Sequence, residues 1–215
     1  MLGLPRETEV GRMVAKKKFY DRADMTTALK DSFTNEVEKI TWANKIAPTT
    51  LNVEAGSDIQ EIEVFHIQLR QKKFNQKILE TIDKAIPYTI LYVLEYQGKQ
   101  QLWLGYKEKS TVTGNTNIVK YFHNDWLGEQ RVSLNGNKLS TIYENFLTEL
   151  SADLTTTDET QSLEQRVAKT QEMDALSKQI EQLTAKMNAT KQFNKKCELN
   201  REIKKLSNKL KELKK

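Results

Sequence analysis

The last quarter of the chain most constrains what it can fold into, because residues 161–215 contain neither proline nor glycine. Residues that favour helices dominate this segment. Apolar side chains recur along it at spacings of three and four, in two runs: Leu176, Ile180, Leu183 and Met187, then Leu199, Ile203, Leu206, Leu210 and Leu213. This spacing is typical of a coiled-coil seam. The sequence therefore predicts a helical coiled-coil tail, and the second run is its expected partner-binding surface.

The two apolar runs of the tail do not share one register. Continuing the first run beyond Met187 predicts seam positions 190, 194, 197 and 201, whereas the second run begins at Leu199 and Ile203. Two forms are open: a single rod of about 80 Å, or a turn within residues 188–196 that lets the two halves pair as an antiparallel hairpin. The oligomeric state is open as well.

Residues 1–150 show the mixed periodicity of a compact α/β body. Apolar positions at helical spacing predict helices over residues 25–47, with Asp24 as the cap, and over residues 75–86 and 139–150. Strands are expected over residues 62–69, 88–96, 101–107 and 118–122. Apolar residues on both faces of the first strand predict that it is covered on both sides. Gly98 between two of these strands indicates a β-hairpin. We expect an α+β fold: a body with a mainly antiparallel sheet, a polar linker over residues 151–160, and the helical tail over residues 161–215.

Positive charge gathers in the tail. The formal net charge is +5, yet residues 1–160 hold 20 Lys and Arg against 22 Asp and Glu, whereas residues 161–215 hold 14 against 7. A basic helix face attracts phosphates without reading sequence. The candidate nucleic-acid-binding residues are Lys204, Lys205, Lys209 and Lys211, and the competing interpretation is a solvated outer face of the coiled coil.

Cysteine content and hydropathy indicate a cytoplasmic protein. The single cysteine, Cys197, can form neither an intrachain disulfide nor a cysteine metal cluster. The opening residues lack an apolar signal segment, and no apolar run approaches the roughly 18 residues that span a membrane. We expect no membrane partner.

Few residues suggest chemistry, and the protein is more readily interpreted as a non-enzyme. The only catalytic candidates are Glu61, Glu63 and Lys107, because a metal-dependent nuclease needs paired carboxylates and a lysine near the phosphate. Carboxylates at this spacing are also common on solvated strands. His66 and His123 are the only histidines, and glycine-rich phosphate loops are absent. We expect no resident metal and no cofactor.

Several separated blocks of sequence resemble a known family. They are Gly3-Leu4-Pro5, Thr8-Glu9-Val10, Lys17-Lys18-Phe19-Tyr20, Trp42-Ala43-Asn44-Lys45, Ala47-Pro48-Thr49-Thr50-Leu51-Asn52, Glu61-Ile62-Glu63-Val64-Phe65, Ile82-Asp83-Lys84-Ala85-Ile86-Pro87-Tyr88, Gly105-Tyr106-Lys107, Tyr143-Glu144-Asn145-Phe146, Lys191-Gln192-Phe193-Asn194-Lys195-Lys196 and Glu198-Leu199-Asn200. The chain resembles domain of unknown function 4391, a family of uncharacterised bacterial and archaeal proteins. The resemblance implies an α/β body followed by a coiled-coil tail. It also implies genes beside a DNA methyltransferase and a helicase in restriction-like or phage-defence clusters, but no catalytic residues.

Three functions are consistent with these observations. The leading hypothesis is a non-enzymatic accessory or adaptor protein of a defence system, which associates with a partner or itself through the tail and lies near DNA. A helicase or DNA methyltransferase is the partner that the resemblance implies. The alternatives are a metal-dependent nuclease that uses strand carboxylates, and a purely structural coiled-coil oligomer.

Overall fold

The computed structural model describes residues 2–20, 25–56, 58–109, 116–151, 154 and 161–214. The chain divides into two compact units, Met1–Ala152 and Asp153–Lys215. We call the first the body and the second the C-terminal hairpin. The predicted linker over residues 151–160 lies almost entirely outside the described residues. The α+β class is confirmed, with a mainly antiparallel sheet in the body and helices at the C-terminal end.

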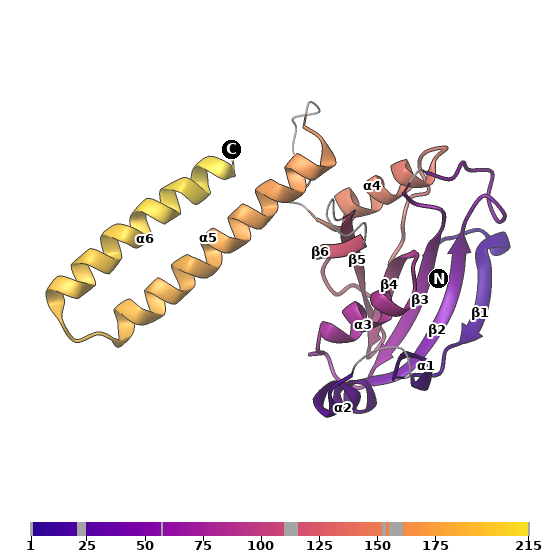
Figure 1. Cartoon of the computed structure of the whole chain (residues 1–215), viewed down its shortest axis with the longest axis horizontal. Coiled ribbons are helices and arrows are strands. Elements are labelled where there is room, and N and C mark those ends of the chain that lie inside the picture. The colour runs from indigo at the N-terminus through magenta and orange to yellow at the C-terminus, as the bar shows by residue number, and fades with distance from the viewer. Residues whose placement is uncertain are drawn as a thin grey trace. The chain divides into compact units, whose positions relative to one another are not determined.

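The body is built on one sheet of six strands in sequential order (Figure 1). The strands are β1 (Glu9–Met13), β2 (Val37–Ile46), β3 (Ile62–Leu69), β4 (Thr89–Tyr96), β5 (Lys99–Lys109) and β6 (Thr116–His123). Only β3 and β4 pair in parallel, and the other neighbours are antiparallel. The turn between β4 and β5 has Gln97 and Gly98 at positive φ, as a tight hairpin turn requires.

Short helices accompany the sheet. They are the 3-10 helix η1 (Arg6–Thr8) and the α-helices α1 (Lys17–Tyr20), α2 (Thr27–Glu36), α3 (Lys77–Ala85) and α4 (Leu139–Leu150). Helix α3 connects the parallel strands β3 and β4, because parallel neighbours need a crossover. It ends before Pro87, with Ile86 already extended.

Both faces of the central strands are buried. Side chains from α1, α2 and α3, among them Phe19, Phe33 and Ile82, share one core cluster with Phe65 and Tyr92 of the sheet. The alternate residues along the central strands point to the opposite face and are also buried, as at Val64, Leu91 and Leu104. Helix α4 packs against β5 and β6. This burial agrees with the sequence expectation that β3 is covered on both sides.

The helix predicted over residues 25–47 is wrong in its second half. Helix α2 ends at Glu36, and the chain continues as strand β2 from Val37. Two β-bulges interrupt the register of β2, so Val37 and Ile40 both reach the same core although they are three residues apart. This spacing imitates a helix. The observed cap is Thr26, whose side chain accepts from the Leu29 amide, and Asp24 lies outside the described residues. The edge strand β1 was also missed.

The C-terminal tail is a hairpin of two helices, α5 (Leu163–Ala189) and α6 (Phe193–Leu213), which pack on each other (Figure 1). The chain turns at residues 190–192, where the two apolar runs lose their common register. Helix α5 begins with a capping box, in which Ser162 and Gln165 satisfy each other's backbone amides. Of the two open forms, the structure therefore shows the antiparallel hairpin.

Candidate functional site

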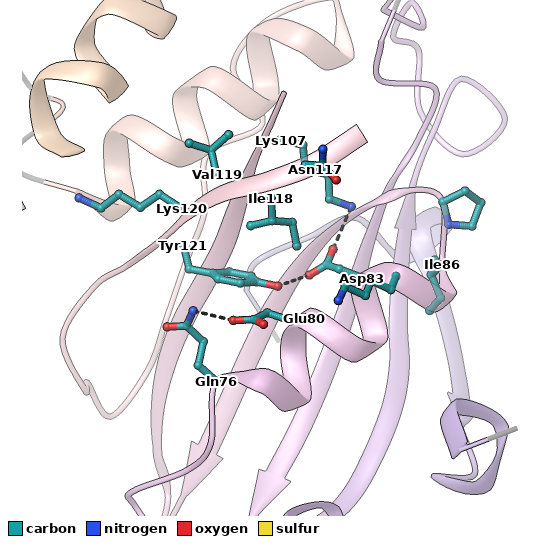
Figure 2. Close-up of a pocket in the computed structure, with 12 residues that line it drawn as sticks. Gln76, Glu80, Asp83, Ile86, Lys107, Asn117, Ile118, Val119, Lys120 and Tyr121 are labelled. Atoms are coloured by element: carbon teal, nitrogen blue, oxygen red, sulfur yellow. Dashed lines mark hydrogen bonds and ion pairs between the residues drawn. The ribbon is translucent and has the colours of Figure 1, made fainter. Parts of the chain in front are cut away.

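A cavity of about 720 Å³, lined by several polar side chains, lies between α3 and the strands β5 and β6. Figure 2 shows Asp83 of α3 pointing toward Lys107 and Tyr121, which come from the two strands. Asp83 Oδ1 lies 2.9 Å from Lys107 Nζ, and the two side chains are 2% and 15% exposed. The cavity also holds polar groups from Gln76, Glu80 and Asn117.

The Asp83 carboxylate is bound by two tyrosine hydroxyls and by the ammonium group of Lys107. The hydroxyls of Tyr92 and Tyr121 donate to Asp83 Oδ2 over 2.9 Å and 2.7 Å. Burial, reinforced by the nearby Asp83 charge, raises the pKa of both tyrosines well above the usual value, so both stay protonated donors. Lys107 Nζ also donates to the Tyr88 carbonyl over 2.8 Å. A buried carboxylate is tolerated here because a cation and two donors surround it.

A second polar cluster lies where β2 and β3 run side by side. Glu63 is 4% exposed and accepts a hydrogen bond from the Trp42 indole. Burial and the adjacent Glu61 charge raise the pKa of Glu63 to about 7. Lys45 pairs with Glu61, and this hydrogen bond raises the pKa of Lys45. The cluster can therefore hold and release one proton near neutral pH.

The structure brings two of the three catalytic candidates together. Glu61 and Glu63 interact directly, whereas Lys107 is held by Asp83 and the Tyr88 carbonyl. Lys45 is the lysine that pairs with the glutamates. Among the described residues, no three His, Cys, Asp or Glu side chains converge as a metal site. Glu61 and Glu63 are the carboxylates that could contribute ligands to a divalent ion.

The two histidines and the single cysteine lie within strands and a helix. His66 Nε2 lies 2.8 Å from Glu95 Oε2, and His123 stacks on Trp103 with ring centroids 4.2 Å apart. Cys197 is half-buried on α6. Both histidines therefore have partners within the sheet, and Cys197 lies within a helix.

The predicted partner-binding residues form one stripe along α6. Leu199 is buried, and Ile203, Leu206, Leu210 and Leu213 are half-buried. The predicted nucleic-acid-binding lysines are exposed, and Lys209 Nζ lies 2.7 Å from Glu172 Oε1 of α5. Counting in opposite directions from this ion pair places Leu199 within one residue of the level of Leu183, and Leu206 within one residue of the level of Leu176. The apolar stripe of α6 therefore faces the apolar run of α5.

Sequence reasoning missed Asp83, Lys45 and the two tyrosines. A signal for Asp83 was present, since it is four residues after Leu79 and three before Ile86, on the apolar face of α3. A carboxylate on such a face predicts a buried partner. Nothing local indicated that the partners would come from β4, β5 and β6.

A family model described as "Domain of unknown function (DUF4391)" matches residues 2–210, nearly the whole chain. No curated protein and no solved structure matches. In the part of the chain that the structure describes, no helix has both the length and the apolar character needed to cross a membrane. The protein belongs to the family of domain of unknown function 4391.

Proposed function

We propose that this protein is a cytoplasmic, non-enzymatic accessory protein that associates with itself or with a partner through its C-terminal hairpin. The single observation that carries the proposal is the incomplete burial of the hairpin's apolar stripe. Leu176 and Leu199 are buried, but the other members of both runs remain half-exposed. A seam shared by two helices stays partly open to water at its edges, whereas a bundle of four helices encloses it more fully. A second hairpin would complete the burial.

The charge of the hairpin supports a role near DNA. Helix α6 carries seven basic and three acidic residues, whereas α5 carries four of each. Lys204, Lys205 and Lys211 lie exposed on α6, outside the apolar stripe. One face of α6 could therefore pack while another meets phosphates. A restriction-like or phage-defence system, with a helicase or DNA methyltransferase as partner, is the context that the family resemblance implies.

The test measures molar mass by size-exclusion chromatography with light scattering. Replacing Ile203 and Leu206 with Asp should abolish association, because charges would enter the stripe. The matched control replaces Asn200 and Asn208, both exposed on the same helix, with Asp. The control should keep the wild-type mass. An unchanged mass in the Ile203→Asp/Leu206→Asp variant would contradict self-association through this stripe.

A heteromeric partner is tested by the same pair of variants. A tagged helicase or DNA methyltransferase from the same genome should co-purify with the wild type and the control but not with the stripe variant. If the wild type is monomeric and retains neither protein, the accessory proposal fails. A purely structural oligomer predicts association without salt-sensitive DNA retention.

A second candidate function, a metal-dependent nuclease, is favoured by the direct contact of Glu61 with Glu63. Two adjacent carboxylates can share a divalent ion instead of a proton. Nicking of supercoiled plasmid with Mg²⁺ or Mn²⁺ tests this. Glu63→Ala should abolish nicking and Glu38→Ala, at an exposed position on β2, should not. Equal nicking by both variants, or none by the wild type, would exclude this site.

A further inference from the structure

The turn of the C-terminal hairpin exposes an aromatic ring among lysines. Phe193, the first residue of α6, is 77% exposed. Among the described residues, the other large apolar side chains that are exposed are Met13 at 71%, Leu127 at 49% and Tyr88 at 39%. Every residue from 191 to 196 is exposed. We call residues 191–196 the hairpin tip. Exposing a phenyl ring to water is unfavourable, and a bound ligand would relieve that cost.

The charge at the tip has one sign. Lys191, Lys195 and Lys196 flank Phe193, and the sequence has no acidic residue between Glu181 and Glu198. All three lysines are exposed, and residues 191–196 include no acidic residue. The tip therefore offers a flat apolar face and several cations to a ligand that is itself anionic and carries flat apolar groups.

We propose that the hairpin tip binds single-stranded nucleic acid, with Phe193 stacking on a base and the neighbouring lysines contacting phosphates. An aromatic platform beside cations is how proteins hold single strands without reading sequence. A duplex keeps its bases stacked inside, so it offers the phosphates but not the base face. Further basic residues follow on α6 at Arg201, Lys204 and Lys205, within about 14 Å of the tip along the helix.

The tip lies outside the apolar stripe used in the proposed association. Phe193 precedes the stripe, which begins at Leu199. This inference therefore goes beyond the accessory role and rests only on the hairpin being exposed at its turn. The two proposals fail separately, because light scattering without nucleic acid tests association alone.

Fluorescence anisotropy with the full chain tests the proposal. The probes are a fluorescein-labelled oligothymidine and a duplex of equal length, each at about 50 mM and about 200 mM salt. We expect Phe193→Ala to weaken binding of the single strand by about tenfold and to change duplex binding by less than about twofold. Phe193→Trp should restore affinity, and its indole fluorescence should be quenched by the oligothymidine.

Matched variants separate stacking from charge and from generic hydrophobicity. Lys195→Gln with Lys196→Gln should lower the salt dependence, whereas Lys178→Gln, at an exposed position on α5, should change it less. Leu127→Ala, an exposed apolar residue of the body, should leave binding unchanged. Since Phe193 is exposed, its replacement should leave the helical circular dichroism intact.

Three outcomes would overturn the proposal. They are equal single-strand affinity of Phe193→Ala and wild type, an equal loss on duplex and single strand, and no binding to oligothymidine at the lower salt. Sedimentation with anionic phosphatidylserine vesicles is run beside these measurements. Phe193-dependent vesicle binding without oligothymidine binding would assign the tip to a membrane surface instead.

Discussion

Two ion pairs show how differently the body and the C-terminal hairpin use charge. In the body, Lys107 and Asp83 are 2.9 Å apart with side chains 15% and 2% exposed. In the hairpin, Lys209 and Glu172 are 2.7 Å apart, but their side chains are 56% and 46% exposed. The first pair cannot lose a member without leaving a charge in the interior, whereas water can replace either member of the second. The body's charges are therefore part of its architecture, and those of the hairpin are available to a ligand.

The chain offers separate probes for the two regions. All three tryptophans, Trp42, Trp103 and Trp126, belong to the body, and the hairpin has none. Tryptophan fluorescence during urea unfolding therefore follows the body. Circular dichroism at helical wavelengths follows chiefly the hairpin, whose two helices are the longest of the described chain.

The largest effect is expected from Asp83→Ala. This change strands Lys107 and two buried tyrosine hydroxyls, so we expect the free energy of unfolding to fall by about 3–5 kcal/mol. Fluorescence-detected urea unfolding measures it. Asp83→Asn, which keeps an acceptor, should cost less. Equal stability of Asp83→Ala and wild type would show that the network does not hold the body together.

In the hairpin, we expect a loss of stability when a buried apolar side chain is removed. Leu199→Ala removes the buried member of the α6 stripe, and we expect a destabilisation of about 2–3 kcal/mol. The half-buried Leu210→Ala should cost about half as much. The loss should appear in the circular dichroism transition and leave the tryptophan transition in place. A matching shift of both transitions would mean that the two units unfold together.

The pH dependence of the body sharpens the comparison. Glu63 has a pKa of about 7 in the folded chain, above the usual carboxyl value, so the folded state holds this proton more tightly than the unfolded state. Its contribution to stability is complete below about pH 4.5 and is lost as the pH rises through about 7. Glu63→Gln should flatten this fall by on the order of 2 kcal/mol. Urea unfolding from pH 5 to pH 8 tests it, with Glu38→Gln as an exposed control. A slope that Glu63→Gln leaves unchanged would assign the titration to another group.

The smallest effect is expected from the exposed ion pair of the hairpin. A double-mutant cycle of Lys209→Gln and Glu172→Gln should give a coupling energy of about 0.2–0.5 kcal/mol, further reduced by salt. The circular dichroism transition measures it. A coupling above about 1 kcal/mol would mean that this pair behaves as the buried pair in the body does, and would remove the distinction between the two regions.

The sequence pattern predicted a helix or strand correctly where that element depends mainly on its own residues. The lack of proline and glycine, with leucines at heptad spacing, predicted the helices of the tail, and the break between the two apolar runs marked the place of the turn. Alternation along residues 62–69 predicted a strand buried on both faces. The pattern failed at Val37, because bulges in β2 place inward residues three apart and imitate a helix.

In the candidate site, too, the sequence suggested residues that are close along the chain and missed those that only packing brings together. The pair Glu61 and Glu63 could be suggested from their spacing of two residues at the start of β3. The position of Asp83, a carboxylate on an apolar helix face, was a weak indication of a buried partner. Its partners are Lys107, Tyr92 and Tyr121, which come from three strands. No spacing in the chain relates them. Only packing of α3 against the sheet defines this group.

The sequence by itself determined the helical tail, its basic charge and the α+β class, because these depend on neighbours within one or two turns or on residue counts alone. The tertiary structure decided that the tail closes into a hairpin, that Lys107 pairs with Asp83 instead of Glu63, and that Phe193 stays in water. Each of these depends on contacts between distant segments, whose free energy is set by burial and by the partners that burial leaves available.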